Sequence, residues 1–318
     1  MAALTVHYSL NLAQLPNPLQ SKVKQLHLDE ETGLFLNSCR PRWFLDTAAD
    51  ILRSCFSLTD VNGMLGRGQM FVVSKAQVRE LVGAALDTRR ASHPGQPLRL
   101  LDVGAGDGEV TSRLASLVDS VSATEVSYFM ARRLRGRGYK VSEGPHITRD
   151  QFPEDGAFDL VTLMNLLDRC DHPMEMLRDA ARLARRGTGR IIIALVLPYS
   201  EFVEEGSKRR ATRGPLPMSG ARCGDGATLE QSLTAFVTRV VLPLGLEVER
   251  VARVPYLCRG DVRQPFYVLS DAILVLKHRV DGASDEEDWG VDEVGGFEVC
   301  ERLLLGMDNV NVIKIRER

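Results

Sequence analysis

Between Leu98 and about residue 242, short apolar runs alternate with amphipathic segments of helical period. Apolar runs of roughly four to eight residues, rich in Val, Ile and Leu, are typical of strands buried on both faces of a sheet. The alternation therefore predicts a mostly parallel sheet that helices cover on both faces. The expected strands are 98–103, 121–125, 138–142, 158–163 and 190–197, and the expected helices are 108–118, 127–136, 172–184 and 228–242.

The last part of this pattern consists of two longer apolar runs, 246–254 and 266–276. An 11-residue connection without helical period, PYLCRGDVRQP, joins them. Strands joined in this way commonly form an antiparallel pair at the edge of a sheet. The whole pattern predicts an α/β fold of Rossmann-like type, in which a mostly parallel seven-stranded sheet ends in an antiparallel edge hairpin.

Outside this core the pattern predicts helices and loops. Residues 45–56 place apolar side chains on one helical face, and Ser74 with Gln77 forms a capping box that opens the next helix. Residues 62–68 (NGMLGRG) form a glycine-rich loop, either a plain turn or a flap near a ligand. Residues 201–227, with many glycines and a basic cluster, are expected to form a surface loop or insertion, and their composition also allows disorder.

The first strand of the core runs into a glycine turn, and the second strand ends at Glu125. Glycines let a backbone approach a ligand closely, and a carboxylate at this position can accept hydrogen bonds from two ribose hydroxyls. The turn has the spacing G-x-G-x-G, and its neighbouring acids would repel a pyrophosphate. It therefore indicates S-adenosylmethionine, which is cationic and lacks phosphate, with a structural turn as the alternative. The expected cofactor-binding residues here are Asp102, Gly104, Ala105, Gly106, Asp107, Gly108 and Glu125.

The loop after the fourth strand carries polar side chains that suit an acceptor-binding site. Asn165 offers both a hydrogen-bond donor and an acceptor, and Asp168 offers a carboxylate that can orient or deprotonate an acceptor nitrogen. Asp171 is expected to cap the following helix, and His172 to be a surface histidine. Tyr256, in the connection between the last two strands, either folds over the site or simply packs in the core.

Composition restricts the function classes without selecting one. The 318 residues carry a formal net charge of -2, so no nucleic-acid partner is expected. The six cysteines show no C-x-x-C spacing and no histidine pair has metal-ligand spacing, which predicts free thiols and no metal. No apolar run is long enough to cross a membrane, so we expect a cytoplasmic, monomeric protein. Its expected parts are an N-terminal helical cap with the glycine-rich loop (1–73), the sheet domain (74–280) and a tail (281–318).

Several separated strings together resemble the DREV family of methyltransferases: NGMLGRGQMFV, LLDVGAGDGEVT, ATE, LMNLLDRCDHP, IIIALVLPY and VPYLCRGD. The resemblance runs from about Asn62 to Lys277. It implies a class I methyltransferase fold and transfer of a methyl group from S-adenosylmethionine, leaving S-adenosylhomocysteine. The implied acceptor is the pros nitrogen of histidine in protein His-x-His motifs. Endomembrane or mitochondrial association is also compatible with the resemblance.

The resemblance also implies roles for particular residues. Glu125 would hold the cofactor ribose, Asn165 and Asp168 would line the cofactor and imidazole site, and Tyr256 would close it. Two alternatives remain at this stage: a methyltransferase for a small molecule or nucleic acid, and a non-catalytic binding module that retains the fold. The sequence contains no His-x-His motif of its own, which excludes automethylation at such a motif.

Overall fold

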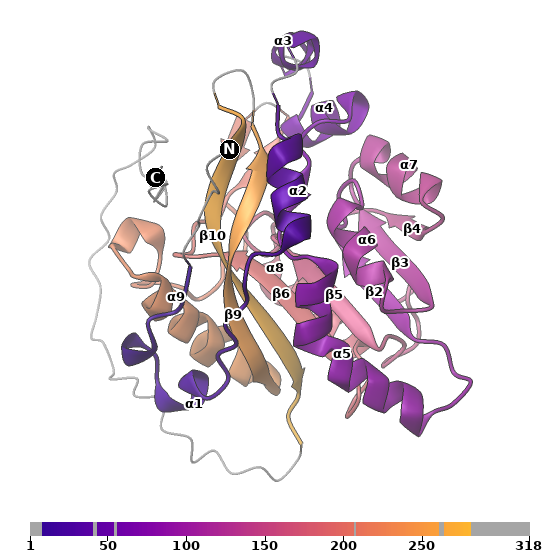
Figure 1. Ribbon diagram of the computed structural model, residues 1–318, viewed down its shortest axis with the longest axis vertical. Helices are drawn as coiled ribbons and strands as arrows, with labels where there is room; N and C mark the ends of the chain where they lie inside the picture. The colour runs from indigo at the N-terminus through magenta and orange to yellow at the C-terminus, as the bar shows by residue number, and fades with distance from the viewer. Residues whose placement is uncertain (1–7, 41–42, 54–55, 207, 261–263, 281–318) are drawn as a thin grey trace.

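The computed structural model describes residues 8–40, 43–53, 56–206, 208–260 and 264–280. One sheet of eight strands, in the order β1-β9-β10-β6-β5-β2-β3-β4, forms its centre (Figure 1). The strands are β1 Met70–Phe71, β2 Arg99–Val103, β3 Ser120–Glu125, β4 Lys140–Glu143, β5 Leu160–Met164, β6 Arg190–Val196, β9 Leu246–Arg259 and β10 Phe266–His278. Strands β2 to β6 pair in parallel, whereas β10 pairs antiparallel with both β6 and β9. The predicted mostly parallel sheet with an antiparallel edge pair is confirmed.

The sheet has one strand more than the seven that the sequence pattern predicts. The additional strand, β1, pairs antiparallel with β9 and covers part of what would otherwise be the sheet edge. It escapes prediction because it is only two residues long and follows the glycines of the N-terminal segment. Through β1, the N-terminal extension becomes part of the sheet.

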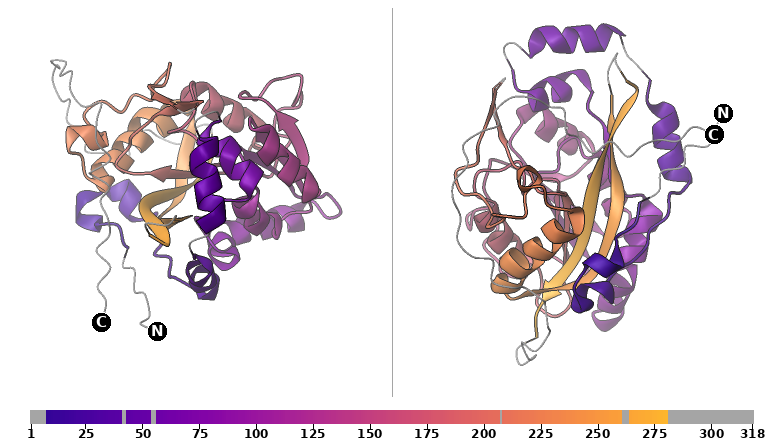
Figure 2. Two further views of the ribbon diagram at one scale, coloured as in Figure 1. Left: turned by 90° about the horizontal axis from the view of Figure 1, so that it is seen from above. Right: turned by 90° about the vertical axis from the view of Figure 1, so that its left-hand side faces the viewer.

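Helices cover both faces of the sheet, as the alternating pattern predicts (Figure 2). Ile191, Ile193 and Leu195 of β6 pack into the core layer beneath α8 and α9, while Ile192 and Ala194 pack into the layer beneath α5. This period of two is the geometry of a strand buried on both sides. The covering helices are α5 Lys75–Ser92, α6 Glu109–Ala115, α7 Tyr128–Gly136, α8 Pro173–Leu183 and α9 Leu229–Phe236. The predicted helix 228–242 is not continuous. After α9 the chain forms a π-helical turn, Val237–Val241, and then a 3₁₀ turn, Leu242–Leu244.

The N-terminal extension is helical, as predicted, but its boundaries differ. It contains a 3₁₀ turn at Leu12–Gln14 and the helices α1 Asn17–Gln20, α2 Glu30–Ser38, α3 Trp43–Leu52 and α4 Leu58–Leu65. The predicted loop at 62–68 is wrong in its first half, because 62–65 complete α4 and Gly66 ends that helix at φ 66°. The capping box of Ser74 and Gln77 at the start of α5 is confirmed.

The connection between the last two strands is shorter than predicted. Strand β9 continues to Arg259, because β10 pairs with it from Phe266 onward and β1 pairs with Leu257 and Cys258 on its other side. Tyr256 therefore lies within a strand, opposite Leu269, and not in the connection between the strands as predicted.

The segment 201–227 is a surface insertion, but its described residues are ordered. It begins with a hairpin of β7, Val203–Glu205, and β8, Lys208–Arg210. Leu216 and Met218 are buried in the main core, and Arg210 forms a bidentate ion pair with Asp171 at 2.6 and 2.7 Å. Buried apolar side chains and a two-pronged ion pair give this glycine-rich segment a fixed path.

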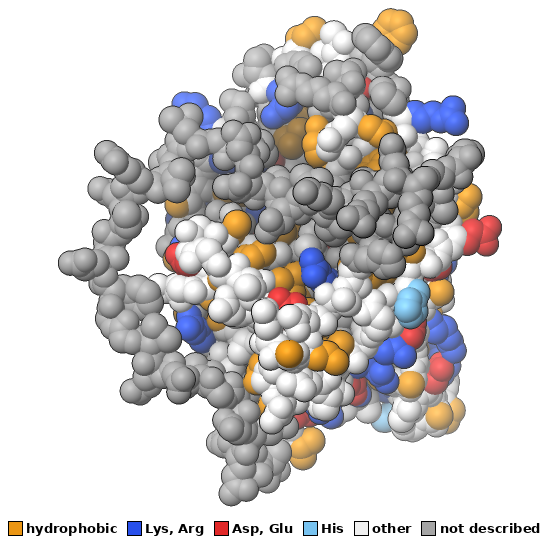
Figure 3. All heavy atoms as spheres, turned by 60° about the vertical axis from the view of Figure 1, so that its left-hand side comes forward, with side chains coloured by type: hydrophobic (Ala, Val, Ile, Leu, Met, Phe, Trp, Pro, Cys, Tyr) orange, Lys and Arg blue, Asp and Glu red, His pale blue; other side chains and the backbone are white. Residues whose placement is uncertain are grey.

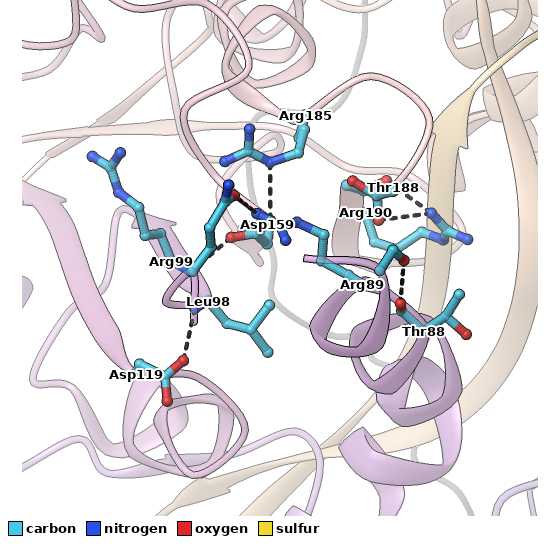
Figure 4. Close-up of polar contacts among 12 residues, drawn as sticks. Thr88, Arg89, Leu98, Arg99, Asp119, Asp159, Arg185, Thr188 and Arg190 are labelled. Atoms are coloured by element: carbon cyan, nitrogen blue, oxygen red, sulfur yellow. Dashed lines mark hydrogen bonds and ion pairs between the residues drawn. The ribbon is translucent and has the colours of Figure 1, made fainter. Parts of the chain in front are cut away.

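At the amino-terminal ends of the central strands, opposite their carboxyl ends, a buried cluster of ion pairs connects α5 to the sheet (Figure 4). Arg89 donates from Nε to Asp159 at 2.8 Å, and Arg185 donates to the same oxygen at 3.0 Å. The other Asp159 oxygen accepts the backbone N–H of Arg99, the first residue of β2. The cluster thus fixes the beginning of β2 and β5 relative to the helices.

Charges of both signs are interspersed on the face that Figure 3 shows, in keeping with the near-zero net charge. The thiols of Cys39, Cys170, Cys223 and Cys258 are free, as predicted, while Cys55 and Cys300 lie outside the described residues. No helix in the described ranges combines the length and apolar character needed to cross a membrane. The predicted tail, 281–318, also lies outside the described residues.

Candidate active site

The candidate site lies beyond the carboxyl ends of β2, β3 and β5, where ligands bind in open parallel sheets. Gly104 and Gly106 turn the chain away from β2 with φ values of 68° and 57°. These left-handed φ values favour glycine; a Cβ on Gly104 would also lie 2.8 Å from the Leu166 side chain, whereas a Cβ on Gly106 would meet nothing within 4 Å. The turn therefore presents bare backbone toward open space above the sheet. The amides of Gly104 and Ala105 are already bonded to the carbonyl of Thr124 on β3.

Glu125, the last residue of β3, is held in place by backbone donors. Its Oε1 accepts the N–H groups of Val126 and Ser127 at 2.9 Å, and its Oε2 accepts that of Gly106 at 2.8 Å. Burial raises the pKa of this carboxyl, while the three backbone hydrogen bonds lower it. Because each carboxylate oxygen has two lone pairs, Oε2 keeps capacity for a ligand hydroxyl. The glycine turn and Glu125, which the sequence predicts to act together, are therefore in direct contact through the hydrogen bond from Gly106.

Further acids surround this corner of the site. Asp102 lies beneath the turn and accepts hydrogen bonds of 2.6 Å from Thr111 and Thr162, and burial raises its pKa to about 6. Asp107 accepts the N–H of Glu109 at the start of α6, just after Gly108. Asp60 of α4 accepts from the hydroxyl of Ser127 at 2.6 Å and lies near enough to raise the pKa of Glu125. This negative environment disfavours phosphate and suits a cationic ligand.

Asn165 sits at the end of β5 in a left-handed conformation, with φ 56°. Its Nδ2 donates to Asp271 Oδ2 at 2.8 Å, and its Oδ1 is buried with no hydrogen-bond partner among the described residues. An amide whose nitrogen is engaged in this way presents its oxygen to the site. Asp271, on β10, is fully buried, and burial raises its pKa well above 3.8. Asp271 thus sets the direction of the Asn165 amide.

Asp168 is the second buried acceptor of the site, with 1% of its side chain exposed. Arg169 Nη1 lies 2.8 Å from Oδ2, but neither carboxylate oxygen accepts an aligned hydrogen bond from the described residues. Burial raises the pKa of Asp168, and the charge of Arg169 opposes that shift. A buried carboxylate without aligned donors is costly unless a ligand supplies them. Asn165 Oδ1 and Asp168 Oδ1 therefore lie buried without a partner among the described residues, while Asp168 Oδ2 is ion-paired with Arg169.

Tyr256 is buried at the same site and does not fold over it from a loop. Its hydroxyl donates to the sulfur of Met70 on β1. Burial raises the pKa of Tyr256 well above 10, and the nearby Cys258, Asp271 and Asp168 raise it further. The N-terminal extension, through Met70, therefore contributes directly to the site.

One prediction about the loop after β5 needs correction. Asp171 does not cap α8, because its carboxylate is engaged by Arg210 of the insertion, which lowers the pKa of Asp171 to about 2. His172 occupies the N-cap position, without a side-chain capping bond, and its ring lies 6.4 Å from that of His146.

Three residues of the site lie outside the sequence-based prediction: Asp60, Met70 and Asp271. Of these, only Asp271 carries a signal that the sequence alone could have supplied. It is an acid inside an apolar run predicted to be a buried strand, and a buried charge of this kind is usually paired or functional. Asp60 and Met70 reach the site through the tertiary packing of α4 and β1 and have no such signal.

The described site thus has two parts. One is the group of acids around Glu125, with open space above Gly106; the other is formed by the acceptor oxygens of Asn165 and Asp168 beyond β5. These groups fit S-adenosylmethionine: Glu125 would hold its ribose, and the acceptors near Asn165 suit its cationic end. No cluster of side chains that could hold a metal ion occurs in the described part of the chain.

Solved methyltransferase structures resemble this fold at low identity. A methyltransferase from Methanosarcina mazei, described as S-adenosylmethionine-dependent, is 11% identical, with 61% of this chain and 98% of that chain covered and a TM-score of 0.39. A putative methyltransferase from Bacillus halodurans is 15% identical, with 61% and 96% covered and a TM-score of 0.36. A Haloferax volcanii complex of a methyltransferase activator and a putative methyltransferase matches at 19% identity over 43% of this chain and 60% of that chain, with a TM-score of 0.29.

The family comparison extends over most of the sequence. The model of the DREV methyltransferase family matches residues 7–278. This range includes the glycine turn, Glu125, the loop after β5, and both β9 and β10. The chain therefore belongs to the DREV methyltransferase family.

Proposed function

We propose that the protein methylates the pros nitrogen of histidine in His-x-His motifs of other proteins. The Oδ1 atoms of Asn165 and Asp168, which are buried beyond β5 and accept no hydrogen bond from the described residues, support this proposal. Neutral imidazole brings an N–H group that these acceptors can bind. Tyr256 would close the site from β9.

Both reactants are already reactive, so the main task of the enzyme is to position them. Imidazole has an ordinary pKa of about 6.5, so most of it is neutral and nucleophilic near pH 7. S-adenosylmethionine supplies an activated, electrophilic methyl group. Asp168 would accept a hydrogen bond from the tele N–H, which fixes the tautomer and leaves the lone pair of the pros nitrogen free. Burial of the site excludes water and holds the ring in line for attack.

Asp168 would also stabilise the product as it forms. Methylation of the pros nitrogen makes the ring cationic while the tele nitrogen keeps its proton. A carboxylate already bonded to that N–H stabilises the developing charge and can accept the proton afterwards, which leaves neutral methylhistidine. The charge of Arg169, 2.8 Å away, opposes the rise in the pKa of Asp168 that burial causes and so favours the ionised carboxylate.

A peptide assay tests the proposal. A short peptide with one His-Ala-His motif, incubated with the protein and S-adenosylmethionine, should gain one methyl group on a histidine. In Asp168→Ala, turnover should fall about 100-fold or more, whereas the affinity for the cofactor product should change little. Unchanged turnover in this variant would exclude the proposed role of Asp168. Methylation of a small molecule or nucleic acid, with no peptide modified, would replace the proposed acceptor.

A further inference from the structure

An unusual pair of arginines lies next to the candidate site. Arg169 and Arg209 stack over the Phe202 ring, with their guanidinium carbons 3.9 and 4.0 Å from its centroid. We call these three residues the arginine ledge. A guanidinium on an aromatic ring is favourable, but two on one ring bring like charges together.

The charges around the ledge are not balanced. Arg209 has no acid within ion-pair distance among the described residues, and the same holds for Arg53, which lies nearby. Burial lowers the pKa of Arg209, and the charges of Arg169 and Arg53 lower it further; only Glu204 opposes them. The Glu204 carboxylate accepts a hydrogen bond from the hydroxyl of Thr59 at 3.2 Å and keeps its charge, so the three guanidinium groups of Arg169, Arg209 and Arg53 lie near two carboxylates, those of Asp168 and Glu204. The ledge therefore has spare positive charge.

The ledge is built onto the proposed methylation site. The backbone N–H of Phe202 donates to the carbonyl of Asp168 at 3.0 Å. Arg169 uses only Nη1 in its contacts with Asp168 and Ser200, and 33% of its side chain is exposed. Its remaining N–H groups have no hydrogen-bond partner in the part of the chain that the structure describes. An anion on the ledge would thus lie within one or two residues of a histidine bound at Asp168.

We propose that the arginine ledge binds the carboxylate of an Asp or Glu that flanks the target histidine in the substrate. This proposal rests on the proposed function. A carboxylate would relieve the repulsion between the arginines and can bond a guanidinium edge bidentately. The enzyme would then select His-x-His motifs in acidic sequence surroundings.

Matched peptides test this selection. Peptides containing His-Ala-His, with Glu, Gln or Lys at the flanking positions, are compared by kcat/KM for the native protein. We expect the Glu peptide to exceed the Gln peptide about 10-fold, mainly through KM, and the Lys peptide to be poorest. The preference should weaken between 50 and about 300 mM salt.

Variants assign the preference to the ledge. In Arg209→Glu, the ratio of Glu to Gln peptide should fall to about one or below, and Arg209→Lys should keep part of it. Arg186→Glu is the matched control. Arg186 is exposed and lies between α8 and β6, at the amino-terminal end of β6 and away from the site, so this substitution should leave the ratio unchanged. Because each ratio is internal to one variant, partial unfolding does not alter it.

The outcomes separate the two proposals. Equal rates on Glu and Gln peptides, with both methylated, overturn the ledge and leave the proposed function intact. Inhibition by a short oligonucleotide at low salt, without any peptide preference, also overturns it in favour of a phosphate site. If no peptide is methylated, the proposed function fails and the ledge proposal fails with it.

Discussion

At the residue scale, the site depends on a few buried polar side chains whose partners fix their direction. Asp271 is the clearest case, because its Oδ2 accepts the hydrogen bond from Asn165 Nδ2 at 2.8 Å. It holds the amide so that its oxygen, and not its nitrogen, is presented. Asp271 is therefore a positioning residue.

Replacing Asp271 with Asn tests this role. The variant can no longer dictate the orientation of Asn165, and we expect kcat/KM on a His-Ala-His peptide to fall about 10- to 100-fold. Asp150→Asn, an exposed acid, is the matched control and should be neutral. A melting temperature near that of the native protein, measured in parallel, distinguishes lost positioning from unfolding. Full activity in a folded Asp271→Asn variant would contradict the assignment.

Glu125→Gln addresses the other half of the site. The amide keeps a similar shape but loses the charge that strengthens hydrogen bonds to ribose hydroxyls. Charged hydrogen bonds contribute about 1.5–3 kcal/mol, so the Kd for S-adenosylhomocysteine, measured by calorimetry, should rise roughly 10- to 100-fold. An unchanged Kd would mean that Glu125 does not contact the cofactor.

At the element scale, the sequence pattern predicts the core well and the extensions poorly. Strands β2, β5 and β6 are largely apolar runs, so their type is visible in the sequence, whereas β3 and β4 are mixed and are recognised by their place in the alternation with helices. Strand β1 and the extension of β9 exist only because they pair with each other and with β10. A two-residue strand has no periodicity of its own. The same limit hides Asp60 and Met70, which tertiary packing alone brings to the site.

Helix α5 offers a test of how its attachment to the sheet is stabilised. Arg89 and Asp159 have side chains that are 1% and 0% exposed, so removing Arg89 leaves a buried charge whose remaining partners among the described residues are Arg185 and the backbone N–H of Arg99. Arg89→Met should lower the free energy of unfolding by about 3–5 kcal/mol in urea titrations. On the same helix, Arg79→Met removes an exposed pair with Asp87 and should cost less than about 1 kcal/mol. Equal losses in the two variants would contradict a role for burial.

At the scale of the whole molecule, the acids gathered under the glycine turn make stability depend on pH. The folded-state pKa of Asp102, about 6, lies above its ordinary value of 3.8. The folded state therefore binds this proton more tightly than the unfolded state. Its stabilising contribution is present below pH 4 and is lost as the pH rises through about 6.

Asp102→Asn removes this titration while keeping groups that can bond Thr111 and Thr162. The free energy of unfolding of the variant minus that of the native protein should become about 2–3 kcal/mol more positive between pH 4 and pH 7.5. Urea titrations at the two pH values measure the difference. Parallel pH profiles for the two proteins would show that Asp102 is not the group responsible.

The central claim is that this DREV-family site transfers a methyl group to the pros nitrogen of a protein histidine. The most direct measurement is mass spectrometry of a His-Ala-His peptide after incubation with the protein and S-adenosylmethionine, followed by comparison of the released amino acid with pros- and tele-methylhistidine standards. We predict one added methyl group, recovered as the pros isomer and absent with Asp168→Ala. Recovery of the tele isomer, or no methylated histidine from a protein that still binds S-adenosylhomocysteine, would contradict the claim.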